Sequence, residues 1–157
     1  MTQSNDHPDI HRNIHPPVVA LFFILLAFLL GRFVHLPLPV PGIVNLTGFV
    51  LTVIGFLCGA GALLAFRKAR TTLNPHGSVN QVVTSGIYRF TRNPIYLGFF
   101  LMIIGLPLNY GNYWGILFAP LFVFTLNRLV IEKEEAYLEK KFGDAYVSYK
   151  SRVRRWL

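Results

Sequence analysis

The chain has 157 residues, enough for one domain, and 53% of them are hydrophobic whereas 14% are charged. Soluble domains carry about 25% charged residues, so this composition excludes an ordinary soluble protein and indicates a membrane protein. The formal charge is +8, from 15 Lys and Arg against 7 Asp and Glu. In so apolar a chain, a basic excess fits cytoplasmic loops and anionic headgroups, and we expect no nucleic-acid partner.

Residues 1–15 are polar and are predicted to form a flexible cytoplasmic N-terminus. The apolar run Pro16 to Val34 follows, and it is long enough to cross a bilayer core of about 30 Å. A cleaved signal peptide is not expected, because the leading segment is not basic and no small-residue cleavage site follows the run. Cys58 is the single cysteine. Since no zinc-type spacing of Cys and His occurs, we expect no metal site.

The second predicted span is the apolar segment 43–66. Three prolines in residues 35–42 predict a connection rather than a helix before it. Gly55 and Gly59 are four residues apart within the span, and this spacing favours a close approach of a second helix. Residues 16–66 are therefore predicted to form a two-helix transmembrane hairpin.

The rest of the chain, 67–157, is predicted to form a second unit. Its first part, 67–93, is polar, with five basic residues and no acidic one. The apolar segment 94–108 rises only about 22 Å. After a tight turn, 113–131 is a further apolar segment, and 132–157 is predicted to be an amphipathic helix with a basic end. The fold class is therefore all-α, an integral membrane bundle of about four transmembrane helices with a cytoplasmic C-terminal amphipathic helix.

The placement of basic residues predicts the orientation of this bundle. Fourteen of the 15 Lys and Arg fall on the side that holds the two termini and residues 67–93, and only Arg32 falls near the other side. The positive-inside rule then puts both termini in the cytoplasm. A re-entrant hairpin formed by the third and fourth apolar segments would give the same sidedness. Any functional site is expected on the cytoplasmic face.

The first motif on that face is GIYRFTRNPIYLG, residues 86–98. Asn93 and Pro94 fit a helix start, with Asn93 as the N-cap and Pro94 in the first turn. The other residues of the motif could also have purely structural roles. Tyr88 and Tyr96 would be aromatic residues at the membrane interface, and Arg89 and Arg92 would face lipid headgroups. Gly98 would allow close packing of a second helix.

The second motif is NRLVIEKEE, residues 127–135, which emerges directly from the last apolar segment. Helical spacing puts Arg128, Glu132 and Glu135 on one face and Glu134 on another. Charged groups at this depth are costly unless they face water, a partner or a ligand. A solvated helix end with intrahelical ion pairs is the alternative explanation.

Taken together, QVVTSGIYRFTRNPIYLG (81–98) and RLVIEKEEAYLEKKFGDAYVSYKSRVRRW (128–156) resemble the isoprenylcysteine carboxyl methyltransferase and phospholipid methyltransferase family of integral membrane enzymes. The resemblance covers about residues 71–157. Asn93 departs from the eukaryotic carboxyl methyltransferases, which usually carry His there, and is frequent in bacterial relatives. The resemblance thus implies a bacterial inner membrane and leaves the methyl acceptor open among prenylcysteine, a phospholipid amine, a small thiol and another lipid.

The resemblance implies S-adenosylmethionine as the cofactor, bound between residues 86–98 and the helix that carries Glu134 and Glu135. No Rossmann-type glycine fingerprint is present. The cofactor needs carboxylates for its ribose or ammonium, donors for its carboxylate and aromatic rings for its adenine and sulfonium. The predicted cofactor-binding residues are Tyr88, Arg89, Arg92, Asn93, Pro94, Tyr96, Gly98, Glu134 and Glu135.

Methyl transfer is an in-line displacement that needs alignment and exclusion of water rather than a covalent enzyme intermediate. The predicted catalytic residues are Arg128, which would orient an anionic acceptor, and Glu134 and Tyr96, one of which would act as a base towards a protonated acceptor. The acceptor is expected to be a lipid or a small molecule. Two alternatives remain, a small NADPH-dependent reductase related to the tail of sterol reductases and a non-catalytic membrane scaffold whose charged residues form a salt-bridge network.

Overall fold

The computed structural model describes residues 15–69 and 81–157, and within these residues it contains helices and connecting segments but no strand. The all-α prediction is confirmed. The predictions made for residues 1–14 and 70–80 lie outside the described residues. In chain order the elements are α1 (Pro16–Phe33), α2 (Gly42–Lys68), the 3₁₀ turn η1 (Gly86–Arg89), α3 (Pro94–Asn109), α4 (Trp114–Leu126), the π-helical turn η2 (Asn127–Ile131), α5 (Glu132–Phe142) and α6 (Asp144–Arg152).

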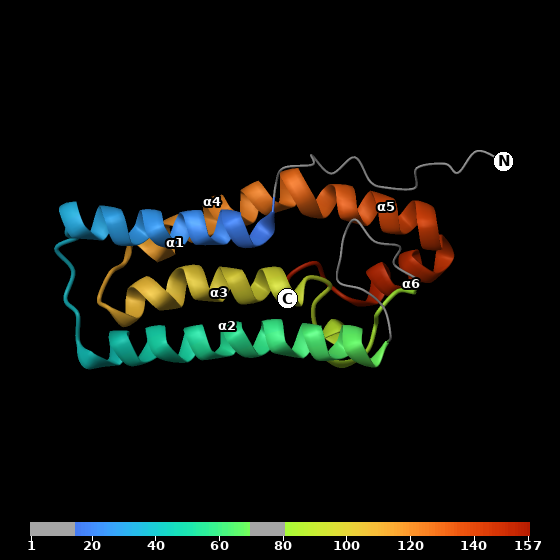
Figure 1. Cartoon of the computed structure of the whole chain (residues 1–157), viewed down its shortest axis with the longest axis horizontal. Coiled ribbons are helices and arrows are strands. Elements are labelled where there is room, and N and C mark those ends of the chain that lie inside the picture. The colour runs from blue at the N-terminus through green and yellow to red at the C-terminus, as the bar shows by residue number, and fades with distance from the viewer. Residues whose placement is uncertain (1–14, 70–80) are drawn as a thin grey trace.

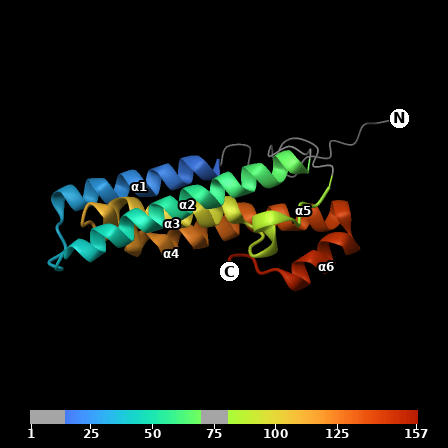
Figure 2. The ribbon, with the colours of Figure 1, turned by 90° about the horizontal axis from the view of Figure 1, so that it is seen from below.

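Helices α1 to α4 lie side by side along the long axis of the molecule, and each runs opposite to the one before it (Figures 1 and 2). The connection 34–41 and the turn between α3 and α4 lie at one end, which we call the connection end. At the other end, the tail end, α5 continues α4 beyond the bundle, and α6 folds back so that the C-terminus lies near the start of α3 (Figure 1).

Three helices are long and apolar enough to cross a membrane: α1, α2 and the continuous helix Trp114–Phe142. The third of the four predicted spans, 94–108, corresponds to α3, which has only 16 residues and rises about 24 Å. Large apolar side chains on these helices are exposed, including Phe22, Leu25, Phe56 and Phe124, each at least half exposed. Such a surface suits lipid rather than water, and the chain is an integral membrane protein.

Helices α2 and α3 are held together by backbone contact at glycines. A Cβ added at Gly55 would lie 2.7 Å from the carbonyl oxygen of Gly98, and one at Gly105 would lie 2.7 Å from that of Gly48. No side chain fits at these distances, so the glycines allow the two backbones to touch. The prediction of close packing is confirmed at Gly55, whereas a Cβ at Gly59 would meet nothing within 4 Å.

Replacing Gly55 by alanine is expected to destabilise the bundle by about 1–3 kcal/mol, because the added methyl forces α2 away from α3. Gly59→Ala is the matched control, since it lies one turn later in the same helix and faces open space. Unfolding by SDS in mixed micelles measures the free energy of unfolding of both variants. Equal stability of the two variants would contradict the glycine-mediated contact.

The amphipathic helix predicted for 132–157, which Gly143 is expected to interrupt or cap, is divided into α5 and α6 at that glycine. Gly143 adopts a positive φ of +52° and ends α5, and α6 then starts in a new direction. Tyr146 and Tyr149 on α6 are buried. The last residues therefore pack back onto the protein instead of continuing away from it.

Candidate functional site

The segment before α3 is fixed at the tail end by its own aromatic residue. Tyr88 in η1 is buried, and its ring lies edge-on to Phe66 of α2 with centroids 5.6 Å apart. The hydroxyl of Tyr149 on α6 donates a hydrogen bond of 2.8 Å to the carbonyl oxygen of Tyr88. Burial raises the pKa of Tyr149 above its usual value, so this hydroxyl keeps its proton and remains a donor. Helices α2 and α6 thus position residues 86–90.

The residues after α6 cross the start of α3 as an extended strand-like tail, 153–157. The backbone N–H of Arg92 donates to the carbonyl oxygen of Arg154 at 3.0 Å. The Asn93 amide and the Thr91 hydroxyl both donate to the carbonyl oxygen of Arg155, at 2.9 and 3.2 Å. Thr91 is completely buried beneath this contact. These bonds attach the tail to the Thr91–Asn93 segment over three consecutive residues.

The predicted start of α3 is confirmed. Helix α3 does begin at Pro94 with Asn93 in the N-cap position, but the Asn93 side chain makes no capping hydrogen bond. Its amide nitrogen donates to the tail instead. The carbonyl of Arg155 competes successfully for this side chain because the tail approaches from outside the helix, a contact that local sequence does not reveal.

A buried charge cluster lies where the tail meets α5. Glu135 forms an ion pair with Arg92 at 2.9 Å and accepts hydrogen bonds from both Nε and Nη2 of Arg155, at 3.0 and 2.8 Å. The side chains of Arg92 and Glu135 are 9% and 8% exposed. The two guanidinium groups face one carboxylate, so the cluster has one positive charge in excess. Within the described part of the chain, the buried Nε of Arg92 has no hydrogen-bond partner.

The neighbouring glutamate, Glu134, contacts the first turn of α3. The hydroxyl of Tyr96, in the first turn of α3, donates a hydrogen bond of 2.8 Å to Oε1 of Glu134. Both side chains are partly buried. Glu134 and Glu135 therefore join α5 to the start of α3 through two separate contacts, one with a phenol and one with guanidinium groups.

The π-helical turn η2 directly precedes these two glutamates. π turns occur often at functional sites because one extra residue in a turn redirects the side chains that follow. Arg128 pairs with Glu132 at 3.5 Å, and their side chains are 65% and 41% exposed. The prediction that Glu135 shares this face is wrong, since Glu135 turns towards Arg92 and Arg155. The extra residue in η2 and the attraction of the guanidinium groups of Arg92 and Arg155 explain the difference.

The remaining predicted residues lie apart from the charge cluster. Arg89 is exposed, and Gly98 is buried in the contact with α2. Pro94 is buried at the start of α3. Arg128 faces outward with Glu132. The structure thus brings together Arg92, Asn93, Tyr96, Glu134 and Glu135 from the predicted set.

Two residues of the tail were missing from the prediction. Arg155 closes the charge cluster, and the indole N–H of Trp156 donates to the Asn127 side chain at 3.2 Å. Trp156 also packs against Phe100, with ring centroids 6.3 Å apart. The only sequence signal for them is the pattern of Tyr146 and Tyr149, which predicts a buried face of the helix just before the tail.

Comparison with known proteins gives a consistent result. A family model described as phospholipid methyltransferase matches residues 43–145. The protein-S-isoprenylcysteine O-methyltransferase of Schizosaccharomyces pombe is 39% identical over 72 residues, 46% of this chain and 30% of that one. The human protein of the same name is 31% identical over 112 residues, 69% of this chain and 39% of its own length.

A third relative has no assigned activity. An uncharacterized protein of Haemophilus influenzae is 43% identical over 63 residues, which cover 40% of this chain and the whole of that protein. The matched regions cover only 30% and 39% of the lengths of the fission yeast and human enzymes. No solved structure matches the chain.

Proposed function

The chain belongs to the phospholipid methyltransferase family, and from this premise we propose that it is a membrane-embedded methyltransferase that uses S-adenosylmethionine. The observation that carries the proposal is the buried cluster Arg92–Glu135–Arg155 beside the Tyr96–Glu134 pair. A cluster with an excess cation next to a carboxylate is suited to a ligand that bears both charges. S-adenosylmethionine has a carboxylate, an ammonium and a sulfonium within one molecule.

The residues present fit this cofactor. A buried donor without a partner costs about 1–3 kcal/mol, so the Nε of Arg92 is expected to gain a partner from a ligand. With the excess positive charge beside it, a carboxylate is the fitting partner, and we propose that Arg92 binds the carboxylate of the cofactor. Glu134 has a second oxygen, Oε2, that receives no donor from the described residues, and it would accept from the ammonium or the ribose hydroxyls.

When bound, the cofactor supplies a methyl group made electrophilic by its sulfonium. The chain's part in the reaction is orientation and exclusion of water. Tyr96 holds Glu134 by its hydroxyl, and the tail with Trp156 covers the start of α3. For an acceptor that arrives protonated, Glu134 is the proposed base, because its Oε1 accepts a hydrogen bond from the Tyr96 phenol and its Oε2 receives no donor from the described residues.

The acceptor is proposed to be a lipophilic or small molecule, in line with the isoprenylcysteine in the names of the relatives. Arg128, which is exposed on the helix that leaves the bundle, would meet an anionic acceptor at the membrane surface. Since the basic residues gather at the tail end, we propose that this end and both termini are cytoplasmic, in a bacterial inner membrane. Of the remaining predicted residues, Tyr88 and Pro94 would support this site by fixing the segment that carries Arg92 and Asn93, whereas Arg89 is exposed and Gly98 packs against α2.

Calorimetric titration of the purified protein in detergent with S-adenosylhomocysteine tests this proposal. We expect saturable binding, and a marked loss of affinity in Asn93→Ala, because the amide of Asn93 holds the tail against the site. Asn45→Ala is the matched control. It removes an equivalent amide that donates at 3.0 Å to the carbonyl oxygen of Asn109, at the connection end.

Absence of binding by protein that shows a cooperative thermal melt would contradict the proposal. Binding of NADPH in place of S-adenosylhomocysteine would favour the reductase alternative. Equal affinity of the Asn93 and Asn45 variants would show that the tail does not contribute to the cofactor site.

A further inference from the structure

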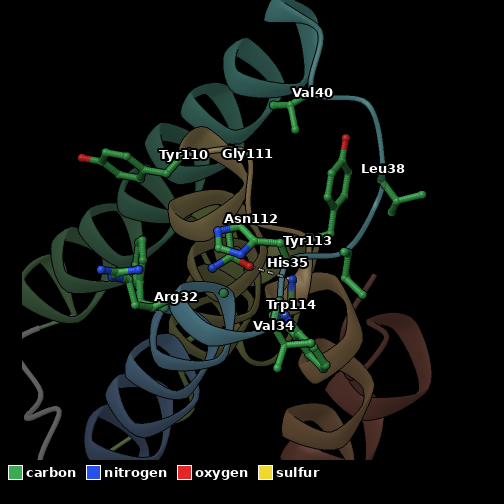
Figure 3. Close-up of a pocket in the computed structure, with 13 residues that line it drawn as sticks. Arg32, Val34, His35, Leu38, Val40, Tyr110, Gly111, Asn112, Tyr113 and Trp114 are labelled. Atoms are coloured by element: carbon green, nitrogen blue, oxygen red, sulfur yellow. Dashed lines mark hydrogen bonds between the residues drawn. The ribbon is translucent and has the colours of Figure 1, made fainter.

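A pocket lies at the connection end, at the opposite end of the bundle from the charge cluster. It has a volume of about 450 Å³ and is formed by the end of α1, the connection 34–41 and the turn between α3 and α4. This volume is within the range of small-ligand sites, about 300–1,000 Å³. Figure 3 shows Arg32 and Tyr110 on one side of it, Leu38 and Tyr113 on the other, and His35 between them.

The walls of this pocket are tied together by hydrogen bonds. The Asn112 amide donates to the carbonyl oxygen of Ala27 at 2.8 Å, and its oxygen accepts from the backbone N–H of Trp114 at 3.0 Å. The indole N–H of Trp114 donates to the carbonyl oxygen of Val34 at 2.9 Å. Two parts of the chain that are distant in sequence, the end of α1 with its connection and the turn between α3 and α4, are thereby joined, so the pocket is built into the fold rather than left by a loose loop.

Three other polar side chains of the pocket do not take part in these hydrogen bonds. Among the described residues, the side chains of Arg32, His35 and Tyr110 make no hydrogen bond or ion pair. An arginine is always charged, and a cation near an apolar surface needs an anion or water. The sequence contains no Asp or Glu between Ile10 and Ile131, so the pocket has no carboxylate to balance Arg32.

The surroundings indicate what kind of anion would bind. The exposed face of α1 next to the pocket is apolar, with Leu25, Leu29 and Phe33 all more than half exposed. Tyr110 and Trp114 are the aromatic types that gather at membrane interfaces. A ligand with a phosphate at the level of Arg32 and acyl chains along α1 would satisfy both the charge and the apolar surface.

We propose that the connection-end pocket is a binding site for the phosphate headgroup of an anionic phospholipid, with Arg32 as its cationic residue. Its location at the opposite end of the bundle from Glu134 separates it from the proposed methyl-transfer site. The proposal does not depend on the proposed function, because a lipid site would exist whether or not the chain transfers methyl groups.

Titration of the full chain in neutral detergent with dihexanoyl-phosphatidylglycerol, followed by calorimetry, tests the site. We expect saturable binding that falls about fivefold in Arg32→Gln, the effect of one cation near an anionic headgroup. Arg32→Lys should retain most of the affinity. Arg152→Gln is the matched control, since Arg152 is an exposed arginine on α6 whose side chain bonds only to Ser148 among the described residues.

Two further probes identify the source of the anion. Dihexanoyl-phosphatidylcholine should bind more weakly, and inorganic phosphate should neither bind tightly nor compete at equal concentration. Tight binding of inorganic phosphate would overturn the lipid assignment. An Arg32→Gln variant that melts cooperatively and binds phosphatidylglycerol as well as Arg152→Gln does would overturn the site itself.

Discussion

Replacing Glu135 by glutamine is expected to lower the free energy of unfolding by about 3 kcal/mol, because it leaves the buried guanidinium group of Arg92 and the partly exposed one of Arg155 without their carboxylate. The geometry explains the size of this effect. Arg92 is almost fully buried, and Arg155 contributes two hydrogen bonds to the same carboxylate. SDS unfolding in mixed micelles measures the change.

The control is Glu139→Gln on the same helix. Glu139 forms an ion pair with Lys150, and both side chains are more than a third exposed. Exposed pairs contribute about 0.5 kcal/mol, so this variant should remain close to the wild type. If the two glutamates proved equally dispensable, the buried cluster would not be the element that holds the tail.

Glu134→Gln is expected to leave the fold intact and to weaken the binding of S-adenosylhomocysteine at least about 30-fold. This is the effect of losing about 2 kcal/mol from one charged contact. The amide still accepts from Tyr96 but no longer has a negative charge to offer the cofactor. Tyr96→Phe should have a smaller effect, because the carboxylate remains and loses only its positioning donor. Calorimetry measures both affinities.

For this prediction too, Glu139→Gln is the reference, since it removes the same charge from an exposed position on α5. A Glu134→Gln variant that binds as tightly as that reference would remove Glu134 from the proposed site. A Glu134→Gln variant that binds S-adenosylhomocysteine normally but transfers no methyl group would instead support the role of Glu134 as the base.

Much of the fold could be predicted from the sequence because its signals are local. The apolar runs place α1 and α2, the prolines before Gly42 mark the connection, and Pro94 marks the start of α3. Gly143 ends α5 by its positive φ, a conformation that favours glycine. The count of four full spans depends on how deeply the short α3 lies in a membrane, which neither hydropathy nor length determines.

Less of the site could be predicted, because its contacts join residues far apart in the chain. The family resemblance implies a site between the segments that carry Tyr96 and Glu134, and in the structure the Tyr96 hydroxyl lies 2.8 Å from Oε1 of Glu134. Arg155 was read as part of a basic end because a cation near a terminus usually meets headgroups. Its pairing with Glu135 depends on α6 folding back and on the register set by η2, and no local pattern encodes either.

The most direct test of the account is a methyl-transfer assay with tritiated S-adenosylmethionine and membrane extracts that contain the protein. The account predicts label in a lipid or small-molecule fraction with the wild type, and strongly reduced label with Glu134→Gln at equal protein level. Identification of the labelled compound would then name the acceptor. Folded wild-type protein that incorporates no more label than the Glu134→Gln variant would contradict the central claim.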